Sequence, residues 1–321
     1  MEYVTFGRIG LKVSVAGLGC GGNSRLGQEQ GKSERESIAI VRQAMDLGVN
    51  LIDTAAVYRT EAIVGKAIQG VPREQVVIAT KATIRAGGKL LPAADIVTSL
   101  HNSLRLLRID HVDIFQLHGV RPCEYDELMR DVVPVLLREQ AQGKFRHLGL
   151  SESSPADHEH DTIRRVLQDD CWDSVMLGFH MLHQNARELV FPGTIRQRIG
   201  TLLMFVVRNI FSQPEYLRNT IGELIAHGTL AADAVDVHDP LGFLVHEGGA
   251  SSVTDAAYRF VRHEPGVHVV LFGTGKPAHV ESNIASILKP PLPARDHARL
   301  SALFGHLVGI GLDLPDRIPG P

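Results

Sequence analysis

Short apolar runs alternate with helix-type segments along this chain, and that alternation constrains the fold more than any other feature. Four of the runs each end in a single polar residue. Strands separated by helices pair in parallel, and the carboxyl ends of parallel strands meet at one edge of the sheet. We therefore expect these polar side chains to lie near one another. They are Asp53, Lys81, His118 and Ser151.

The chain has 321 residues, and the alternation continues to about residue 288. A hairpin is expected over residues 4–13. Eight strand–helix pairs follow and fit a closed (β/α)8 TIM barrel of the α/β class, because right-handed crossovers leave few other topologies. A Pro-rich tail from residue 289 gives a C-terminal extension, and the lack of a low-complexity linker indicates one domain over residues 1–321. The predicted strands are 15–18, 49–53, 76–81, 112–118, 145–151, 174–179, 201–207 and 267–272.

The helices are predicted from apolar residues that recur at helical spacing. The first begins with a capping box formed by Ser33 and Glu36. An extra helix over residues 213–227 and a tail helix over residues 295–308 lie outside the repeating pattern. The others are expected over residues 33–47, 61–69, 92–107, 125–142, 155–168, 187–197, 252–263 and 277–288.

Composition narrows the class of partner. Apolar residues make up 44%, charged residues 21%, and the formal net charge is −3, which favours neither nucleic acid nor an anionic membrane. The three cysteines show no C-x-x-C pairing, as is typical of a reducing compartment. No stretch approaches the ~18 apolar residues of a membrane span, and no secretion signal is evident. We expect a soluble, cytoplasmic protein with a small-molecule partner; its oligomeric state is left open.

A tyrosine near the predicted strand ends suggests proton chemistry. Free tyrosine has a pKa near ~10, so it is a poor acid at neutral pH. Lys81 beside Tyr58 would lower that pKa, and Asp53 would keep the lysine charged. A phenol of this kind can donate a proton to a carbonyl oxygen, while a neutral His118 orients the substrate. Because no side chain supplies hydride, a nicotinamide cofactor is implied. Each residue alone fits a cap, a packing or a surface role; only the joint pattern indicates catalysis.

The sequence also resembles the aldo-keto reductase family, densely in its first half and thinly in its second. The resemblance implies a barrel that binds NADP(H) or NAD(H) and reduces aldehydes or ketones, or oxidises the corresponding alcohols or sugars. It gives Tyr58 the acid/base role, Asp53 and Lys81 the tuning of its pKa, and His118 the orientation of the carbonyl. The motifs are NLIDTAAVY (50–58), EAIVGKA (61–67), IATK (78–81), SLRLLRIDHVDIFQLH (103–118) and GKFRHLGLS (143–151).

The same resemblance assigns cofactor contacts, and here the chain departs from the family pattern. The family's Ser-Asn pair, which holds the nicotinamide carboxamide, reads Ser151-Glu152, and Met176 stands where a Gln is usual. The stacking Tyr falls near Phe205. NADP is favoured and NAD stays possible. The predicted cofactor-binding residues are Gly19, Cys20, Gly21, Ser151, Met176, Phe205, Arg208, Gly273, Thr274, Gly275, His279 and Asn283.

Two functions remain open from the sequence. The intact set of Tyr58, Lys81, Asp53 and His118 favours an enzyme, because a pure binding protein has no evident use for a tuned phenol. The altered carboxamide positions favour a non-catalytic nicotinamide-binding sensor or regulatory subunit. No metal site is predicted, since the histidine pairs lack a convincing ligand set. Substrate specificity is expected in residues 23–32, 85–91, 209–249 and the tail from 289.

Overall fold

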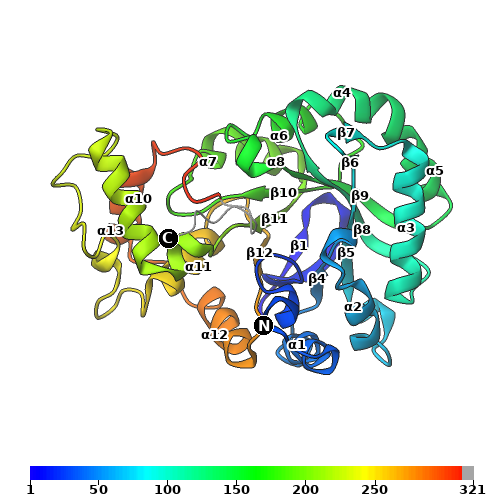
Figure 1. Ribbon diagram of the computed structural model, residues 1–321, viewed down its shortest axis with the longest axis horizontal. Helices are drawn as coiled ribbons and strands as arrows, with labels where there is room; N and C mark the ends of the chain where they lie inside the picture. Colours follow the sequence, from blue (N-terminus) through cyan, green and yellow to red (C-terminus); the bar gives the residue numbers. More distant parts are fainter. Residues whose placement is uncertain (313–321) are drawn as a thin grey trace.

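The computed structural model describes residues 1–312 and contains a closed barrel of eight parallel strands, as predicted. The strands follow one another around the barrel in the order β10, β11, β12, β3, β4, β5, β8, β9. Figure 1 shows the strands in the centre with helices around them. The barrel strands are β3 (Ala16–Gly19), β4 (Leu51–Asp53), β5 (Val77–Thr83), β8 (Val112–Val120), β9 (Phe145–Glu152), β10 (Ser174–Gly178), β11 (Gly200–Met204) and β12 (Val269–Phe272).

Helices follow the strands along the chain. The capping box predicted for the first helix is present: the Ser33 side chain accepts from the backbone of Glu36, and the Glu36 side chain accepts from the backbone of Ser33. A π-helical turn, Leu128–Val132, joins α4 to α5. The helices are α1 (Glu34–Asp46), α2 (Glu61–Ala67), α3 (Ala93–Leu107), α4 (Tyr125–Glu127), α5 (Val133–Ala141), α6 (Asp161–Val166), α7 (Ala186–Leu189), α8 (Phe191–Gln197), α9 (Asn209–Ser212), α10 (Pro214–Ala226), α11 (Val253–Arg262), α12 (Pro277–Ile287) and α13 (Ala294–Phe304).

The predicted N-terminal hairpin forms from β1 (Tyr3–Phe6) and β2 (Leu11–Ser14) and supplies part of the inner core. Phe6 is fully buried in the cluster that fills the barrel, together with Leu51, Ile114 and Leu202. A side chain at Gly200 would place its Cβ 2.4 Å from the Phe6 ring. Glycine at the start of β11 therefore gives the hairpin room to pack against the barrel.

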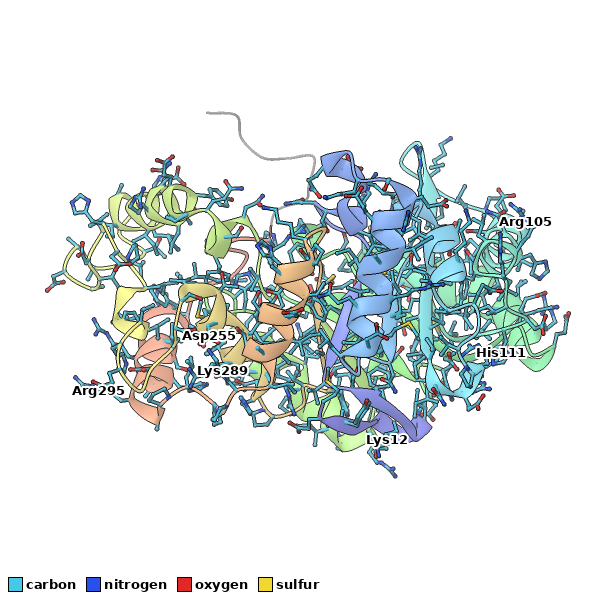
Figure 2. All side chains as sticks on the ribbon, turned by 90° about the horizontal axis from the view of Figure 1, so that it is seen from below. Lys12, Arg105, His111, Asp255, Lys289 and Arg295 are labelled. Carbon is cyan, nitrogen blue, oxygen red and sulfur yellow. The ribbon has the colours of Figure 1, made fainter. Side chains whose placement is uncertain are left out.

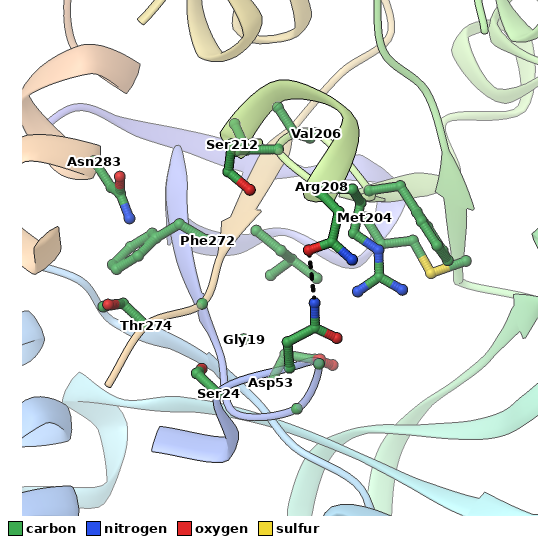
Figure 3. Close-up of a pocket in the computed structure, with 18 of the residues that line it drawn as sticks. Gly19, Ser24, Asp53, Met204, Val206, Arg208, Ser212, Phe272, Thr274 and Asn283 are labelled. Atoms are coloured by element: carbon green, nitrogen blue, oxygen red, sulfur yellow. Dashed lines mark hydrogen bonds between the residues drawn. The ribbon is translucent and has the colours of Figure 1, made fainter. Parts of the chain in front are cut away.

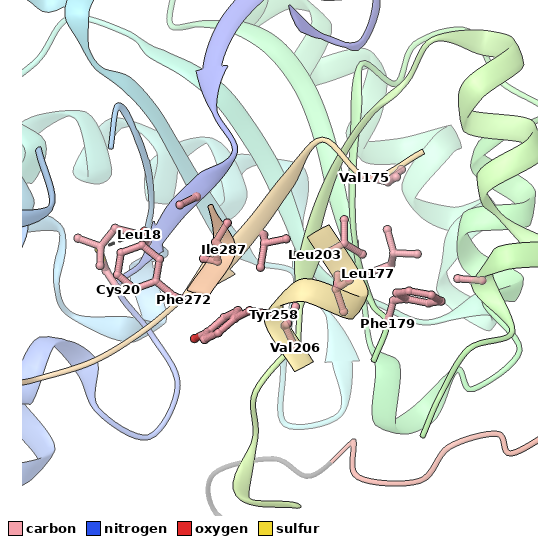
Figure 4. Close-up of a cluster of buried hydrophobic side chains, with 14 of the residues drawn as sticks. Leu18, Cys20, Val175, Leu177, Phe179, Leu203, Val206, Tyr258, Phe272 and Ile287 are labelled. Atoms are coloured by element: carbon pink, nitrogen blue, oxygen red, sulfur yellow. Dashed lines mark hydrogen bonds between the residues drawn. The ribbon is translucent and has the colours of Figure 1, made fainter. Parts of the chain in front are cut away.

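A larger apolar layer lies between the strands and the helices. Leu18, Phe272 and Ile287 lie close together in Figure 4, where β3 and β12 meet α12. Because residues alternate sides along a strand, neighbours such as Leu202 and Leu203 belong to the inner and the outer cluster respectively. The barrel strand β11 is thus packed on both faces.

The insertion after β11 and the tail lie to one side of the barrel. At the left of Figure 1, α10 and α13 stand away from α3 and α5 on the opposite side. The extra helix predicted over residues 213–227 is confirmed as α10. Lys289, just after α12, pairs with Asp255 of α11 at 3.0 Å, and Figure 2 shows the two side by side. No helix within residues 1–312 is long and apolar enough to cross a membrane.

Several predicted boundaries were wrong. Lys81, His118 and Ser151 do not end their strands, because β5, β8 and β9 continue to Thr83, Val120 and Glu152. A hairpin of β6 (Arg85–Ala86) and β7 (Lys89–Leu90) then follows β5. These strands are longer than their apolar runs because backbone pairing continues to Thr83 opposite His118 and to Val120 opposite Glu152.

The helix predicted over residues 155–168 is much shorter, since only Asp161–Val166 is α-helical. The Asp157 carboxylate accepts from the N–H groups of Asp161 and Thr162 at 2.8 Å each, so it caps the helix late. The helix predicted over 187–197 is divided at Val190, ahead of a proline at the start of α8. The tail helix ends at Phe304 rather than residue 308; residues 313–321 lie outside the described residues.

Candidate active site

A cavity of about 1230 Å³ opens at the carboxyl ends of the barrel strands. Its volume exceeds the 300–1,000 Å³ of ordinary small-ligand pockets, so it has room for an extended ligand. Figure 3 shows Thr274 and Asn283 on the β12 side and Met204 and Arg208 on the β11 side. The cavity lies where active sites of parallel barrels occur.

The structure brings the four predicted catalytic side chains together at one end of this cavity. Lys81 Nζ donates to both carboxylate oxygens of Asp53 at 2.7 Å and to the carbonyl oxygen of Thr54 at 2.9 Å. The same nitrogen lies 5.1 Å from the centre of the Tyr58 ring. The Tyr58 hydroxyl is 3.4 Å from Nε2 of His118, with the two rings edge to face.

Lys81 and Asp53 form a buried ion pair, with side-chain exposures of 0% and 4%. Burial lowers the pKa of Lys81, but the charges of Asp53 and Tyr58 and the hydrogen bond that Lys81 donates to Asp53 outweigh burial and raise this pKa above its ordinary value. Burial also raises the pKa of Asp53, against the opposing effect of Lys81. The lysine therefore keeps its proton and its charge beside the phenol.

The pKa of Tyr58 differs from the sequence prediction. The sequence predicted a lowered pKa because of Lys81. In the structure burial is the largest influence and raises the pKa of Tyr58, and Asp53 raises it further, while Lys81 and Arg208 lower it. The lysine and aspartate charges offset one another because both lie close to the phenol. Tyr58 consequently holds its proton at neutral pH and is ready to act as an acid.

His118 is neutral, as predicted. Burial, with the positive charges of Lys81 and Arg85, lowers the pKa of His118 to about 3. The guanidinium of Arg85 is held by both carboxylate oxygens of Glu124, with Nε to Oε1 at 2.8 Å. A neutral imidazole beside the phenol can form a hydrogen bond to a substrate oxygen without competing for the proton.

A glycine makes room for the phenol. The backbone of Tyr58 sits in a 3₁₀ turn, Ala56–Tyr58, directly after β4. A Cβ built on Gly21 would lie 2.5 Å from two carbons of the Tyr58 ring. Contacts shorter than about 3 Å do not occur between packed carbons. The loop after β3 must therefore carry glycine at this position for the phenol to occupy its place.

All but one of the predicted cofactor-binding residues line the cavity. The exception is Cys20, whose side chain is fully buried and belongs to the outer apolar cluster. Burial, with the nearby Asp53 charge, raises the pKa of the Cys20 thiol. The residues that do line the cavity are Gly19, Gly21, Ser151, Met176, Phe205, Arg208, Gly273, Thr274, Gly275, His279 and Asn283.

The loop after β12 forms a close backbone cradle before α12. A Cβ on Gly273 would lie 3.1 Å from the carbonyl oxygen of Gly19, and one on Gly275 would lie 2.4 Å from Cα of Gly27. The loop leads into α12, and the positive end of a helix dipole suits an anion such as a phosphate. On the facing wall, the Arg208 guanidinium stacks 4.3 Å from the centre of the Phe205 ring.

Sequence reasoning missed a second buried ion pair, between Glu152 and His160. In the sequence, Glu152 stands out only as a departure from a family pattern, and no motif links it to a histidine. A glutamate inside a buried strand run was the signal that could have pointed to a compensating cation. Among residues 1–312 no cluster of three or more metal-binding side chains occurs.

Comparison with known proteins identifies the class. The model of the aldo/keto reductase family matches residues 17–304, so the chain belongs to this family of NAD(P)-dependent oxidoreductases. It is 29% identical over 309 residues to the aldo-keto reductase YhdN of Bacillus subtilis, covering 88% of this chain and 87% of that protein. It is 32% identical to the L-galactose dehydrogenase of Arabidopsis thaliana over 157 residues, 47% of this chain and 48% of that protein.

Solved structures agree on the fold. Aldo-keto reductase AKR11C1 from Bacillus halodurans, in its holo form, superposes with a TM-score of 0.72 at 22% identity, covering 98% of this chain and all (100%) of that one. An aldo/keto reductase from Klebsiella pneumoniae, in complex with NADP and acetate, superposes with a TM-score of 0.69 at 21% identity, covering 94% and 95%. At these sequence identities, the structural similarity shows that the barrel fold is shared and nothing further.

Proposed function

We propose that this protein reduces aldehydes or ketones with NADPH or NADH, or oxidises the corresponding alcohols or sugars, with Tyr58 as its acid/base. The single observation that carries the proposal is the convergence of Tyr58, His118 and the Lys81–Asp53 pair at one end of a cavity large enough for a dinucleotide. A group that supplies hydride to a carbonyl carbon needs a proton for the carbonyl oxygen at the same place.

The residues around the cavity fit a dinucleotide. The backbone at Gly275 leaves no room for a side chain and that at Gly273 leaves little, and the N-terminal end of α12 suits a phosphate. Lys276 and His279 also line the cavity, and the Lys276 ammonium adds a positive charge, which favours NADP over NAD. When bound, the nicotinamide supplies the hydride.

Each protein group has one task in this proposal. His118, neutral, donates a hydrogen bond to the carbonyl oxygen and orients it. Tyr58 donates its proton to that oxygen as negative charge develops there, and takes it back in the reverse direction. The Lys81 ammonium stabilises the phenolate that remains, and Asp53 keeps Lys81 charged. General acid catalysis of this kind contributes about 10²–10⁴-fold in rate.

The test is a titration followed by an activity panel. NADPH and NADH are titrated against the protein by fluorescence, and each complex is then offered a panel of aldehydes and ketones. We expect binding of at least one cofactor, NADPH the tighter of the two, and turnover of some members of the panel. Tight binding without turnover of any member would instead support a nicotinamide-binding sensor.

A further inference from the structure

The loop that carries Tyr58 is closed at its base by two buried hydroxyl groups. Thr54 directly follows Asp53 at the end of β4, and Thr60 directly precedes α2. Their Oγ1 atoms are 2.9 Å apart and form a hydrogen bond in which either hydroxyl can be the donor. Both residues are fully buried. Residues 55–59 therefore form a loop whose two ends are joined directly.

Thr60 uses its hydroxyl for this bond and not for the helix that follows it. A threonine at the N-cap of a helix ordinarily accepts a hydrogen bond from a backbone N–H of the first turn. Thr60 is the N-cap residue of α2, yet its side chain makes no such bond. Closure of the loop has thus replaced the ordinary role of a threonine at this place.

The loop also contains a strained residue beside the phenol. Arg59, directly after Tyr58, has a left-handed backbone with φ of 60° and ψ of 23°, which residues with a side chain rarely adopt. Such conformations persist only where the surrounding structure holds them, and they gather at functional sites. The bond between Thr54 and Thr60 fixes the two ends of the loop at the separation that this turn requires.

The same pair of threonines contacts the ion pair beside the phenol. The carbonyl oxygen of Thr54 accepts from Lys81 Nζ at 2.9 Å, while the same nitrogen donates to Asp53. Thr54 is therefore joined on one side to the ammonium and on the other to the loop of Tyr58. Neither Thr54 nor Thr60 is among the residues that line the cavity, so both can act only through these groups.

The next residue of α2 makes a second link, on the lysine side. The Thr80 hydroxyl donates to Oε1 of Glu61 at 2.6 Å, and both residues are buried. Thr80 directly precedes Lys81 in β5, and residues alternate sides along a strand, so Thr80 faces α2 while Lys81 faces Asp53. The start of α2 thus holds both β4 and β5 from behind the ion pair.

We propose that Thr60 is a positioning residue for Tyr58. Its hydrogen bond to Thr54 closes the loop and keeps the phenol in place against His118 and the Lys81 ammonium. This inference rests on the proposed function, since it assumes that the phenol transfers a proton. Displacement of a reacting group by about 1 Å lowers a rate by as much as 10²-fold. Loosening the loop should therefore lower kcat and leave the binding of cofactor and carbonyl substrate nearly unchanged.

The test removes the hydrogen bond in two ways. Thr60→Val keeps the shape of the side chain and lacks the hydroxyl, so the Thr54 hydroxyl is left buried without this partner, which destabilises the fold. This variant is expected to lower kcat about tenfold and to lower the melting temperature. Thr54→Val combined with Thr60→Val leaves no hydroxyl unpaired. The double variant is expected to regain part of the melting temperature and to keep the low kcat, because the ends of the loop are still not joined.

Two further variants are controls. Thr60→Ser keeps the hydroxyl and should retain the kcat of the parent. Thr98→Val removes an exposed hydroxyl of α3, which donates to the carbonyl of Ala94 at 2.9 Å, and should leave kcat unchanged. Steady-state kinetics give kcat and KM separately, and a fluorescence titration gives the dissociation constant of the cofactor. We expect KM and this dissociation constant to match those of the parent in every variant.

The outcomes separate positioning from a general effect on stability. An unchanged kcat in Thr60→Val overturns the inference, and so does a kcat that recovers together with the melting temperature in the double variant. Either result leaves the proposed function standing. If the parent turns over no member of the carbonyl panel, the proposed function fails and this inference fails with it.

Discussion

Two buried ion pairs, Lys81–Asp53 and His160–Glu152, lie beside the end of the cavity that holds Tyr58. They differ in how close their cations lie to the cavity. In each pair the carboxylate, Asp53 or Glu152, lines the cavity while the cation lies behind it. Lys81 lies 5.1 Å from the centre of the reactive phenol ring. His160 reaches the cavity only through Glu152 and a serine hydroxyl. In the proposed function the first pair acts on proton transfer, whereas the second supports the cavity wall through Ser154.

Substitutions in the two ion pairs should therefore change different measured quantities. Changes around Lys81 should appear mainly in kcat, because they alter a charge beside the transferred proton. Changes around His160 should appear mainly in stability, because its contacts are with Glu152 and Asn185 behind the cavity.

Tyr58→Phe removes the proton donor and leaves the ring that fills the space beside Gly21. We expect kcat for aldehyde reduction to fall by about 10²–10⁴-fold, while the dissociation constant of NADPH changes little. Steady-state kinetics and a fluorescence titration measure the two quantities. An unchanged kcat would exclude Tyr58 as the acid.

Lys81→Met leaves the Asp53 carboxylate buried without its partner. Breaking a buried pair in this way costs about 3–5 kcal/mol in the free energy of unfolding, and kcat should fall as well. Lys66→Met is the matched control, because Lys66 pairs with Glu34 at the surface with side-chain exposures of 37% and 54%. Such surface pairs are worth about 0–1 kcal/mol. Equal denaturant midpoints for the two variants would contradict the role assigned to the buried pair.

Gly21→Ala places a methyl group where the Tyr58 ring now lies, 2.5 Å from its carbons. The ring must shift, and a displacement of a reacting group by about 1 Å lowers the rate by as much as 10²-fold. We expect kcat to fall about ten- to hundredfold with a small change in melting temperature. Gly22→Ala would be a poor control because its φ is 69°, whereas Gly222→Ala, with open space around its Cβ, is suitable. A normal kcat would show that the phenol position is not critical.

His160→Gln should lower the free energy of unfolding by about 1–3 kcal/mol, since Glu152 loses a charged partner but keeps two other donors. The pKa of folded His160 lies above its ordinary value, so its stabilising effect is complete below the unfolded pKa of about 6.5 and is lost as pH rises through the folded pKa. Asp157 adds to the rise in this pKa, while the neighbouring His183, whose own pKa is lowered by burial to about 2, stays neutral.

Denaturant unfolding at pH 6 and at progressively higher pH measures this difference between parent and His160→Gln. The gap should be widest at pH 6 and should narrow as pH rises. A gap that widens with pH would mean that His160 is neutral in the folded protein.

The sequence could predict the first pair because its members follow the regular pattern of the barrel. Asp53, Lys81 and His118 lie in neighbouring strands, so strand order alone brings them to one edge. Even there the pKa of Tyr58 was predicted in the wrong direction. The balance among burial, Lys81 and Asp53 depends on distances and solvent access that no spacing in the sequence contains.

The second pair could not be predicted in this way. Glu152 and His160 are joined by an irregular segment with a proline in a 3₁₀ turn, a late helix cap at Asp157 and a left-handed residue. Helical periodicity suggested a continuous helix over residues 155–168, which would have directed these side chains elsewhere. Because Asp157 caps the helix at Asp161 and Thr162, the preceding residues are not helical. The irregular course of these residues brings His160 into contact with Glu152.

The most direct test of the central claim, that the Tyr58 phenol carries the transferred proton, is the pH dependence of kcat in both directions. Because the pKa of Tyr58 is raised and that of His118 lies at about 3, reduction should stay constant through neutral pH and fall in the alkaline range, while alcohol oxidation rises over the same range. The account predicts that both changes share one pKa and vanish in Tyr58→Phe. The same inflection persisting in that variant would contradict it.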